Sequence, residues 1–362
     1  MSNQAASADQ IFEGKMHMDF TKYSQFIADE TLALLAIDSP SGMTKKACDH
    51  VMARFEALGY APQRTRKDGV LVCLGGKNMD DAILLEAHMD TLGGMVAEVK
   101  SNGRLRITRI GGLNANNVET ETCRVYTMGG AVIEGTAQLC NASVHVNGKY
   151  QETERTFDSI EIVLDEDVKS AADAKKLGIR NGDFVCFEPR ACVTKSGYIK
   201  SRFLDDKLSV GIVMGYAKYL KDEGVTPERG VWVHVTTFEE VGHGGSASVP
   251  QGVTEAISVD MGCVGDGLEC TERMVSICAK DSGGPYHYDV VRGLVAAAEK
   301  MEAAYAVDIY PFYGSDVEAT LRAGHDIRHG LIGSGVYASH GYERSHLEGV
   351  IATLKVLIGY IA

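Results

Sequence analysis

The sequence has few basic side chains for its length, 36 against 49 acidic ones, which gives a formal net charge of −13. A surface of this charge repels nucleic acid phosphates and anionic lipid head groups, so we expect the protein to bind neither. No apolar run approaches the roughly 18 residues that a membrane-spanning helix needs. The segment Met1–Glu13 also lacks the basic and apolar parts of a secretory signal. We therefore expect a cytoplasmic protein.

The cysteine pattern excludes two common uses of this residue. The nine cysteines are odd in number and irregularly spaced, and no two of them form a Cys-x-x-Cys pair. Neither a disulfide framework nor a thiolate zinc site is indicated. We interpret them as reduced, mostly buried thiols.

Length and composition predict a folded protein of two domains. A chain of 362 residues exceeds the span of one ordinary domain, about 100 to 200 residues. With 45% apolar and 23% charged residues, the chain has the balance of a globular protein.

Helical and strand patterns alternate near both ends of the chain, which indicates an α/β layer. The patterns predict helices over 23–37, 45–58, 207–221, 288–304, 317–323 and 347–361. They predict buried strands over 69–74, 82–87, 231–238, 256–260 and 327–332. We therefore predict an α/β domain with a mixed sheet flanked by helices, formed by residues 1–92 and 201–362.

Between these two parts, short alternating strands predominate. They are predicted over 104–110, 123–127, 132–137, 143–146, 160–163 and 184–187, with one helix over 168–177. This range, 93–200, is predicted to be a β-rich unit inserted into the α/β domain.

Ionisable groups follow several of the apolar strands. The strand that ends at Ala87 leads into His88-Met89-Asp90, and the strand period of two places His88 and Asp90 on one face. One of them can bind a metal ion while the other orients it. The alternative is a strand-end histidine that is only hydrogen-bonded to a nearby aspartate.

Two acidic pairs follow. Asp205-Asp206 stands at a predicted helix start, where one aspartate commonly caps the helix and leaves the other free to bridge two cations. Glu239-Glu240 ends a strand that is almost wholly apolar or β-branched. Adjacent glutamates repel each other, so we expect positive charge there, with one glutamate ligating metal and its neighbour taking a proton from water. Solvated loop charge is the alternative.

Further candidate ligands lie toward the C-terminus. Asp260 ends another apolar strand, and the carboxyl ends of strands are where sites form in open α/β sheets. The last ligand is expected from His340 or His346. Ser345-His346-Leu347-Glu348 has the form of a capping box, which would place His346 on the first turn of the closing helix. We therefore favour His340 as the ligand.

The candidate ligands contain no sulfur. Histidine and carboxylate donors favour zinc, cobalt or manganese, and a carboxylate-rich set suits two divalent ions that share a water. The predicted metal ligands are His88, Asp205, Glu240, Asp260 and His340.

The order of these residues resembles metallopeptidase family 42, the tetrahedral and glutamyl aminopeptidases of clan MH. The resemblance spans nearly the whole chain and includes Ser39-Pro40-Ser41-Gly42 and Glu239-Glu240-Val241-Gly242. It implies a zinc-peptidase-like fold in which the insert is a dimerisation domain, and a homo-oligomer, in the family often a twelve-subunit tetrahedral shell.

The resemblance also implies roles for single residues. One metal ion would be bound by His88, Asp205 and Asp260, and the other by Asp205, Glu240 and His340. Glu239 would be the general base, and Asp90 would orient His88.

Two motifs depart from the family pattern. Asp205-Asp206-Lys207 stands where the family usually has Asp-Asn-Arg, and His340-Gly341-Tyr342-Glu343 where it usually has His-Ser-x-x-Glu. Both variants are also similar to the related di- and tripeptidases of family 20. The run from Ser339 to His346 resembles a divergent branch linked to synthesis of the osmoprotectant N-acetylglutaminylglutamine amide. The alternative function is therefore a family 20 type di- or tripeptidase, or a deacylase, acting on a small glutamine-containing peptide.

The predicted reaction is hydrolysis of the N-terminal peptide bond of a short peptide by a water that two metal ions activate. Glu239 would take the proton of that water and return it to the leaving amine. A glycosidase, which needs only two carboxylates, and a catalytically silent scaffold are rival classes. Ser315-Asp316-Val317-Glu318 has the form of another capping box, so Asp316 is interpreted as structural, while the loop 310–314 could line a pocket.

Overall fold

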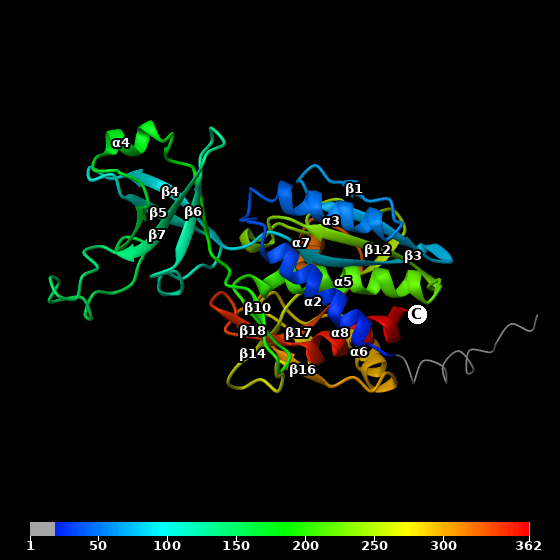
Figure 1. Cartoon of the computed structure of the whole chain (residues 1–362). Helices are drawn as coiled ribbons and strands as arrows, with labels where there is room; N and C mark the ends of the chain where they lie inside the picture. The colour runs from blue at the N-terminus through cyan, green and yellow to red at the C-terminus, as the bar shows by residue number, and fades with distance from the viewer. Residues whose placement is uncertain (1–18, 362) are drawn as a thin grey trace, which may run out of the picture.

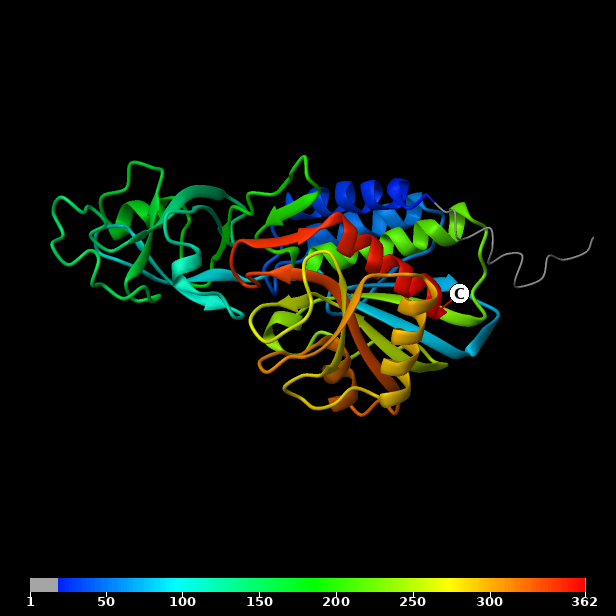
Figure 2. The same ribbon diagram turned by 90° about the horizontal axis from the view of Figure 1, so that it is seen from below.

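The computed structural model describes residues 19–361, so the segment Met1–Glu13 lies outside the described residues. An α/β domain carries a smaller β barrel on one side (Figure 1, Figure 2). Among the described helices, none is both long and apolar enough to cross a membrane. The predicted α/β class, with a mixed sheet flanked by helices, is confirmed.

The α/β domain is built on a twelve-stranded sheet. Its strands are β1 (Gln63–Arg64), β2 (Val70–Gly75), β3 (Asn78–His88), β10 (Cys192–Val193), β11 (Tyr198–Ser201), β12 (Arg229–Thr236), β13 (Val253–Val259), β14 (Gly262–Val264), β15 (Val275–Lys280), β16 (Tyr305–Ile309), β17 (Arg328–Tyr337) and β18 (Glu343–His346). The order is β1-β2-β12-β3-β13-β17-β18-β11-β10, with β14 and β15 paired to β17 and β16 paired to β15.

The centre of this sheet positions the site. Strands β12, β3, β13 and β17 are adjacent and mutually parallel. Within this register, Thr236 at the end of β12 lies opposite His88 at the end of β3. Because parallel strands end at the same edge of a sheet, the segments that follow β3, β12 and β13 meet at that edge.

Helices cover both faces of the sheet. They are α2 (Thr21–Leu35), α3 (Lys45–Ala57), α5 (Leu204–Asp222), α6 (Tyr288–Lys300), α7 (Asp316–Arg322) and α8 (Leu347–Ile361). Side chains of β3 alternate between two cores, as the strand period requires. Ile83, Leu85 and Ala87 are buried with residues of α2, α5 and α8, whereas Leu84 is buried with Val317 of α7.

A buried lysine ties the helix layer to the start of α5. Lys207 is 1% exposed, and its Nζ donates to the carbonyl oxygens of Leu34 at 3.0 Å and of Ile37 at 2.7 Å. These carbonyls lie at and just beyond the end of α2, where the Leu34 carbonyl also accepts the main-chain N–H of Ile37 at 3.0 Å. The ammonium group therefore binds the C-terminal end of α2.

The middle of the chain forms a closed barrel in the order β4-β5-β8-β7-β6-β9. Its strands are β4 (Gly93–Val99), β5 (Leu105–Ile110), β6 (Thr122–Tyr126), β7 (Val132–Leu139), β8 (Ile160–Leu164) and β9 (Phe184–Phe187), with the short helix α4 (Ala171–Lys176). The predicted range 93–200 contains this barrel and also β10 and β11, which pair with the large sheet.

One strand predicted within the barrel is wrong. Residues 143–146 form turns, and Val144 and Val146 are 57% and 76% exposed. The valines suggested a strand, but no neighbouring strand covers them, so the local preference is not stabilised by burial.

Candidate metal centre

His88 ends β3 with only 1% of its surface exposed. Its Nδ1 lies 2.9 Å from the main-chain carbonyl oxygen of Asp90. Because a carbonyl only accepts, Nδ1 carries a proton and Nε2 faces the site, 3.0 Å from Oδ1 of Asp205. Burial acts to lower the pKa of His88, but Asp205 and the neighbouring acids raise it well above its usual value. The space between Nε2 and Asp205 therefore favours a positive charge, either a proton or a metal ion.

Asp205 divides its carboxylate between two histidines. Oδ1 faces His88 at 3.0 Å, and Oδ2 lies 3.5 Å from Nε2 of His340. Burial alone would raise the pKa of Asp205, but the contacts with His340 and His88 hold it well below its usual range. An ionised carboxylate that offers one oxygen to each side has the geometry of a ligand bridging two cations.

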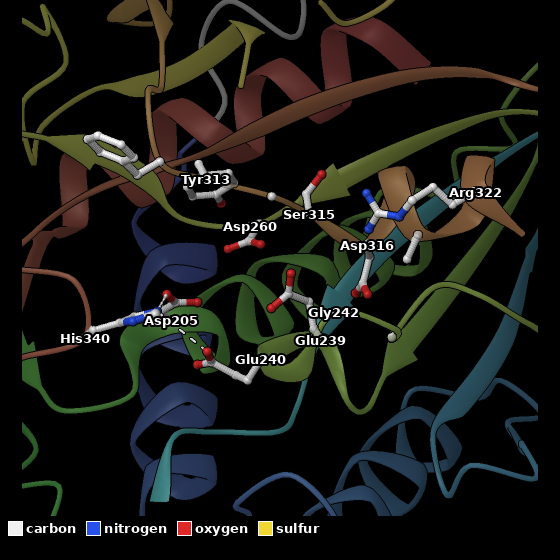
Figure 3. Close-up of a pocket in the computed structure, with 14 residues that line it drawn as sticks. Asp205, Glu239, Glu240, Gly242, Asp260, Tyr313, Ser315, Asp316, Arg322 and His340 are labelled. Carbon is white, nitrogen blue, oxygen red and sulfur yellow. Dashed lines mark ion pairs between the residues drawn. The ribbon is translucent and has the colours of Figure 1, made fainter. Parts of the chain in front are cut away.

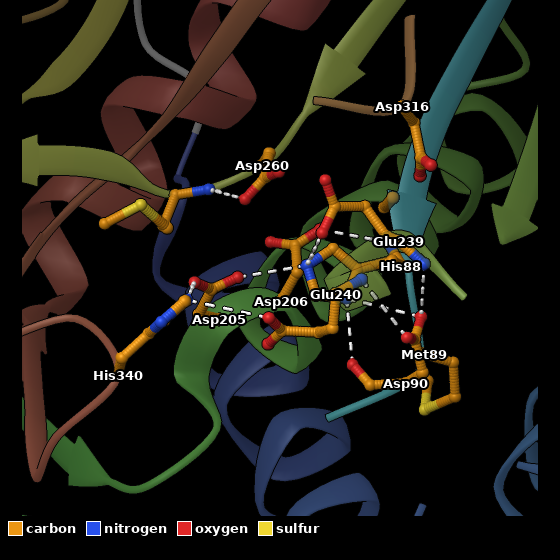
Figure 4. A network of polar contacts seen from close by, with 12 residues as sticks. His88, Met89, Asp90, Asp205, Asp206, Glu239, Glu240, Asp260, Asp316 and His340 are labelled. Carbon is orange, nitrogen blue, oxygen red and sulfur yellow. Dashed lines mark hydrogen bonds and ion pairs between the residues drawn. The ribbon is translucent and has the colours of Figure 1, made fainter. Parts of the chain in front are cut away.

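Two groups of possible ligand atoms share this aspartate (Figure 4). One consists of His88, Asp205 and Asp260, and the other of Asp205, Glu240 and His340. Within each group, one donor atom from every residue lies within 4.8 Å of the others. The structure thus brings together all five ligands that the sequence predicts.

The carboxylates of the site would carry more negative charge than its histidines can neutralise. Burial, reinforced by neighbouring carboxylates, raises the pKa of Asp260 to about 7. For the same reasons the pKa values of Glu239 and Glu240 are well above their usual range. Divalent cations would take the place of the protons that these groups otherwise retain. The donors are nitrogen and oxygen only, so the residues present fit zinc, cobalt or manganese.

The two adjacent glutamates point to different parts of the centre. Phe238 takes a left-handed conformation with φ of 69°, and a single 3-10 turn, η2 (Glu239–Val241), follows it. Glu239 Oε2 lies 3.7 Å from Nε2 of His88, whereas Glu240 Oε2 lies 3.6 Å from Nε2 of His340. In a regular strand the two side chains would point to opposite faces of the sheet. The turn instead directs both carboxylates into the centre, each toward a different histidine.

Asp90 acts on the centre through both its main chain and its side chain. Its carbonyl oxygen accepts from Nδ1 of His88, while its carboxylate Oδ1 is 3.7 Å from the same nitrogen. The carboxylate accepts the main-chain N–H of Glu239 at 3.1 Å and of Glu240 at 3.3 Å, and the hydroxyl of Ser41. The main chain of Asp90 thus orients His88, and its side chain holds the glutamate turn.

The two C-terminal histidines have different surroundings. His340 lies on the loop between β17 and β18. Burial acts to lower the pKa of His340, but the contact with Asp205 outweighs it and the pKa rises to about 9. His346 ends β18, where its Nε2 donates to the carbonyl oxygen of Ser196 at 2.8 Å. His340 lines the cavity, and His346 is held by other partners outside both groups of ligand atoms.

The capping box predicted at Ser345 is wrong. Nδ1 of His346 accepts the main-chain N–H of Glu348 at 3.0 Å, so His346 itself caps α8. The Ser345 hydroxyl instead donates to the carbonyl oxygen of Gly335 at 2.8 Å. Pairing of β18 with β11 extends the strand to His346 and leaves the serine inside it.

Glu343 and Asp206 support the ligands through main-chain contacts. Glu343 accepts the N–H of Asp205 at 3.0 Å with Oε2 and the N–H of His340 at 2.9 Å with Oε1. Asp206 accepts the N–H of His88 at 3.1 Å, rather than acting as the helix cap expected for one of the two aspartates. The peptide bond between Asp205 and Asp206 is cis. Both acids act through hydrogen bonds to segments that are distant in the chain, so no local sequence motif could reveal these roles.

A cavity of about 290 Å³ opens onto this centre (Figure 3). His340, Asp205 and Glu240 lie at one end, and Asp316 and Arg322 at the other. The predicted lining by the loop 310–314 is confirmed, since Phe312, Tyr313 and Gly314 border the cavity.

The capping box predicted at Ser315 is not formed. The Ser315 side chain makes no cap hydrogen bond, and its Oγ lies 2.8 Å from the hydroxyl of Tyr286. Asp316, interpreted from the sequence as structural, lines the cavity. The sequence did not reveal that Asp316 lines the cavity, because the Ser-x-x-Glu pattern around it is also typical of a helix start.

Comparison with known proteins agrees with this architecture. The family model described as M42 glutamyl aminopeptidase matches residues 68–356. The Bacillus subtilis protein YhfE, named as a candidate aminopeptidase, is 41% identical over 328 residues, which cover 91% of this chain and 95% of YhfE.

Solved structures share the fold at lower identity. The aminopeptidase APDkam598 of the archaeon Desulfurococcus kamchatkensis superposes with a TM-score of 0.81 at 21% identity, over 94% of each chain. The TET1 peptidase of Pyrococcus horikoshii, described as assembling into a tetrahedron or a large octahedral shell, has a TM-score of 0.78 at 20% identity, over 92% of this chain and 98% of that chain. With the family match covering most of the chain, the protein belongs to the M42 glutamyl aminopeptidase family.

Proposed function

We propose that the chain removes N-terminal residues from short peptides by means of a dinuclear metal centre. Membership of the M42 family makes the protein a hydrolase, a metal-dependent aminopeptidase. The proposed ligands are His88, Asp205 and Asp260 for one ion, and Asp205, Glu240 and His340 for the other. The observation that carries the dinuclear proposal is the Asp205 carboxylate, which turns one oxygen to each histidine.

A pair of divalent ions at these ligands would lower the pKa of a water and polarise the scissile carbonyl group. Zinc is the proposed metal, with cobalt and manganese as alternatives, because the donors are imidazole nitrogen and carboxylate oxygen. The chain itself supplies the ligand geometry, the proton acceptor and the cavity for the substrate.

Glu239 is the proposed general base. Its carboxylate lines the cavity and lies next to His88 without belonging to either group of ligand atoms. It would take a proton from the attacking water and return it to the nitrogen of the leaving amine. Asp90 supports this role, because its carboxylate holds the main chain of Glu239 and Glu240.

The rival classes make different demands on the site. The family match and YhfE do not favour the family 20 type peptidase or deacylase, although a glutamine-containing dipeptide remains a substrate to test. A glycosidase would need two carboxylates and no metal, so full inhibition by a chelator would argue against it. A silent scaffold does not require the buried ligand set.

The barrel is the proposed dimerisation unit of a homo-oligomer. Its family resemblance and the assembly described for the Pyrococcus horikoshii TET1 peptidase support this proposal. All nine cysteines are free thiols, as suits a protein of the reducing cytoplasm. Light scattering of the purified protein would give the number of subunits, with a dodecamer as the expected result.

The central test combines metal analysis with a cleavage assay on aminoacyl anilides. Two metal ions per chain and hydrolysis that a chelator abolishes are expected for the wild type. Glu239→Gln should keep both ions and lose at least about 100-fold in kcat, because the proton acceptor is gone. Glu223→Gln changes a glutamate at the far end of α5 and is the matched control. Full hydrolysis by Glu239→Gln would refute the base assignment.

A further inference from the structure

Asp316 is a buried carboxylate to which the proposed reaction assigns no role. It begins α7 and lines the cavity next to Glu239, with 2% of its surface exposed (Figure 3). Oδ2 accepts a hydrogen bond from the hydroxyl of Thr236, but Oδ1 has no hydrogen-bond partner. A buried carboxylate oxygen without a donor is energetically costly. The unsatisfied Oδ1 therefore marks a position where a donor from outside the chain would be stabilised.

No cation of the described chain is in direct contact with this carboxylate. Within residues 19–361, no lysine, arginine or histidine forms an ion pair with Asp316. Lys67 directs its ammonium group to main-chain oxygens, including that of His243 at 2.6 Å. Arg322, which lines the same cavity, lies 3.4 Å from a carboxylate oxygen of Glu318. Both basic side chains are thus engaged with other partners.

Gly244 packs closely against Oδ1 beside the glutamate turn. A Cβ atom added at Gly244 would lie 2.1 Å from Oδ1 of Asp316 and 3.1 Å from Cα of Glu239. Any side chain at this position would displace the Asp316 carboxylate or the loop. The close approach places Oδ1 next to the proposed base, and Asp316, Gly244 and Glu239 all line the cavity where a substrate would lie.

We infer that Asp316 binds an ammonium group of the N-terminal residue of the substrate, an inference that rests on the aminopeptidase function proposed above. An ammonium group brings both the donor and the positive charge that Oδ1 lacks. Two sources offer this chemistry: the α-ammonium group of any free N-terminus and the side-chain ammonium group of an N-terminal lysine. In either case Asp316 is a substrate-binding residue: in the first it selects peptides with a free N-terminus, and in the second it selects an N-terminal lysine over neutral residues.

Asp316→Asn separates these sources in the metal-loaded, full-length protein. Asparagine keeps the shape and an acceptor for Thr236, but it removes the charge. Three substrates carry the ammonium group at different places: the p-nitroanilides of leucine, of lysine and of 6-aminohexanoic acid, which has no α-amine. If Asp316 binds the α-ammonium group, KM rises about 10- to 100-fold for leucine and lysine. If it binds the side-chain group, KM rises only for lysine and 6-aminohexanoic acid. Unchanged KM for all three, or a loss confined to kcat, overturns the inference.

Two further variants guard against a general effect of the substitution. Gly244→Ala should raise KM for the same substrates, because its Cβ would displace Oδ1. Unchanged KM in this variant would count against the inference even if Asp316→Asn failed to fold.

Asp308→Asn is the matched control. Asp308 is buried on β16, and its two oxygens accept main-chain N–H groups of Glu269 and Cys270, away from the cavity. Its KM values should equal those of the wild type.

A binding measurement distinguishes failure of this inference from failure of the proposed function. A wild type that hydrolyses none of the substrates would contradict the proposed function alone. Calorimetric titration of the metal-loaded protein with L-leucinamide and with 4-methylpentanamide, which lacks the α-amine, then tests α-ammonium binding without turnover. Asp316→Asn should weaken leucinamide about 10- to 100-fold and leave the des-amino amide unchanged. Equal affinities of wild type and variant for leucinamide overturn the α-ammonium assignment.

Discussion

Oδ1 of Asp90 accepts the main-chain N–H of Glu239 at 3.1 Å, although the two residues are 149 positions apart in the chain. The same carboxylate accepts the N–H of Glu240 and the hydroxyl of Ser41. One buried side chain thus joins the turn after α2, the end of β3 and the end of β12. The position of the proposed base depends on this junction rather than on the strand that carries it.

Asp90→Ala should therefore reduce both activity and stability. The variant leaves buried N–H groups without an acceptor, which costs on the order of 1–3 kcal/mol for each unsatisfied group. A shift of the glutamate turn by about 1 Å is enough to lower kcat/KM roughly 100-fold. Urea unfolding and anilide hydrolysis measure the two effects. Ser41→Ala removes only one of the donors and should have a clearly smaller effect, and equal losses in both variants would contradict this account.

Glu343→Gln should weaken metal binding without removing a ligand. Glu343 accepts the N–H groups of both Asp205 and His340, and an amide side chain has only one oxygen to offer. Substitution of groups that orient metal ligands typically costs about 10- to 100-fold in affinity. Competition with a chromogenic chelator measures the loss. Glu348→Gln, on the exposed side of α8, is the control, and wild-type affinity in Glu343→Gln would refute the supporting role.

Metal content should follow the two groups of ligand atoms. The wild type is expected to bind two ions per chain, and His340→Ala one, because His88, Asp205 and Asp260 remain. Asp205→Ala should lose both, since it belongs to each group. Mass spectrometry of the metal in dialysed protein gives these ratios. His346→Asn keeps a side chain able to cap α8 and should retain two ions; loss of an ion there would make His346 the ligand.

The buried pair Glu86 and His234 predicts a pH-dependent contribution to stability. His234 Nδ1 lies 3.4 Å from Oε1 of Glu86 across β12 and β3, and burial lowers the pKa of His234 to about 4. Because the folded pKa lies below the ordinary value of 6.5, the imidazole stabilises the fold fully above pH 6.5 and loses this contribution as the pH falls to 4. The difference corresponds to about 3 kcal/mol.

Unfolding of wild type and His234→Gln at pH 7 and pH 4 measures this contribution. The free energy difference between the two proteins should shrink by about 3 kcal/mol toward pH 4. Burial raises the pKa of Glu86 to about 8, so its own titration favours the fold as the pH falls. Glu86 is present in both proteins, and its effect largely cancels in the comparison. A difference that stays constant with pH would show that His234 is not held neutral.

Local sequence patterns predicted most of the regular elements near the site. The closing helix was predicted over 347–361 and α8 has these bounds, because its apolar stripe has an unbroken helical period. The strand predicted over 82–87 is the core of β3, whose apolar residues are buried on both faces. Strands β15 and β16 were not predicted. They contain buried polar residues that are hydrogen-bonded: Ser276 accepts from the hydroxyl of Tyr310, and Asp308 accepts from the main-chain N–H of Cys270. Those partners are distant in sequence.

The sequence alone determined the chemistry that is available: histidine and acidic groups at the ends of apolar strands, with no sulfur among them. Only the tertiary structure decided which of them meet. The parallel order β12-β3-β13-β17 sets the ends of three strands beside one another, and the loop after β17 turns His340 toward Asp205 while strand pairing holds His346 away. The orientation of Asp316 toward the cavity was likewise decided by its contacts with Thr236 and the glycine loop. Such contacts arise from pairing between distant segments, whereas a local pattern reports only the preference of neighbours for helix, strand or turn.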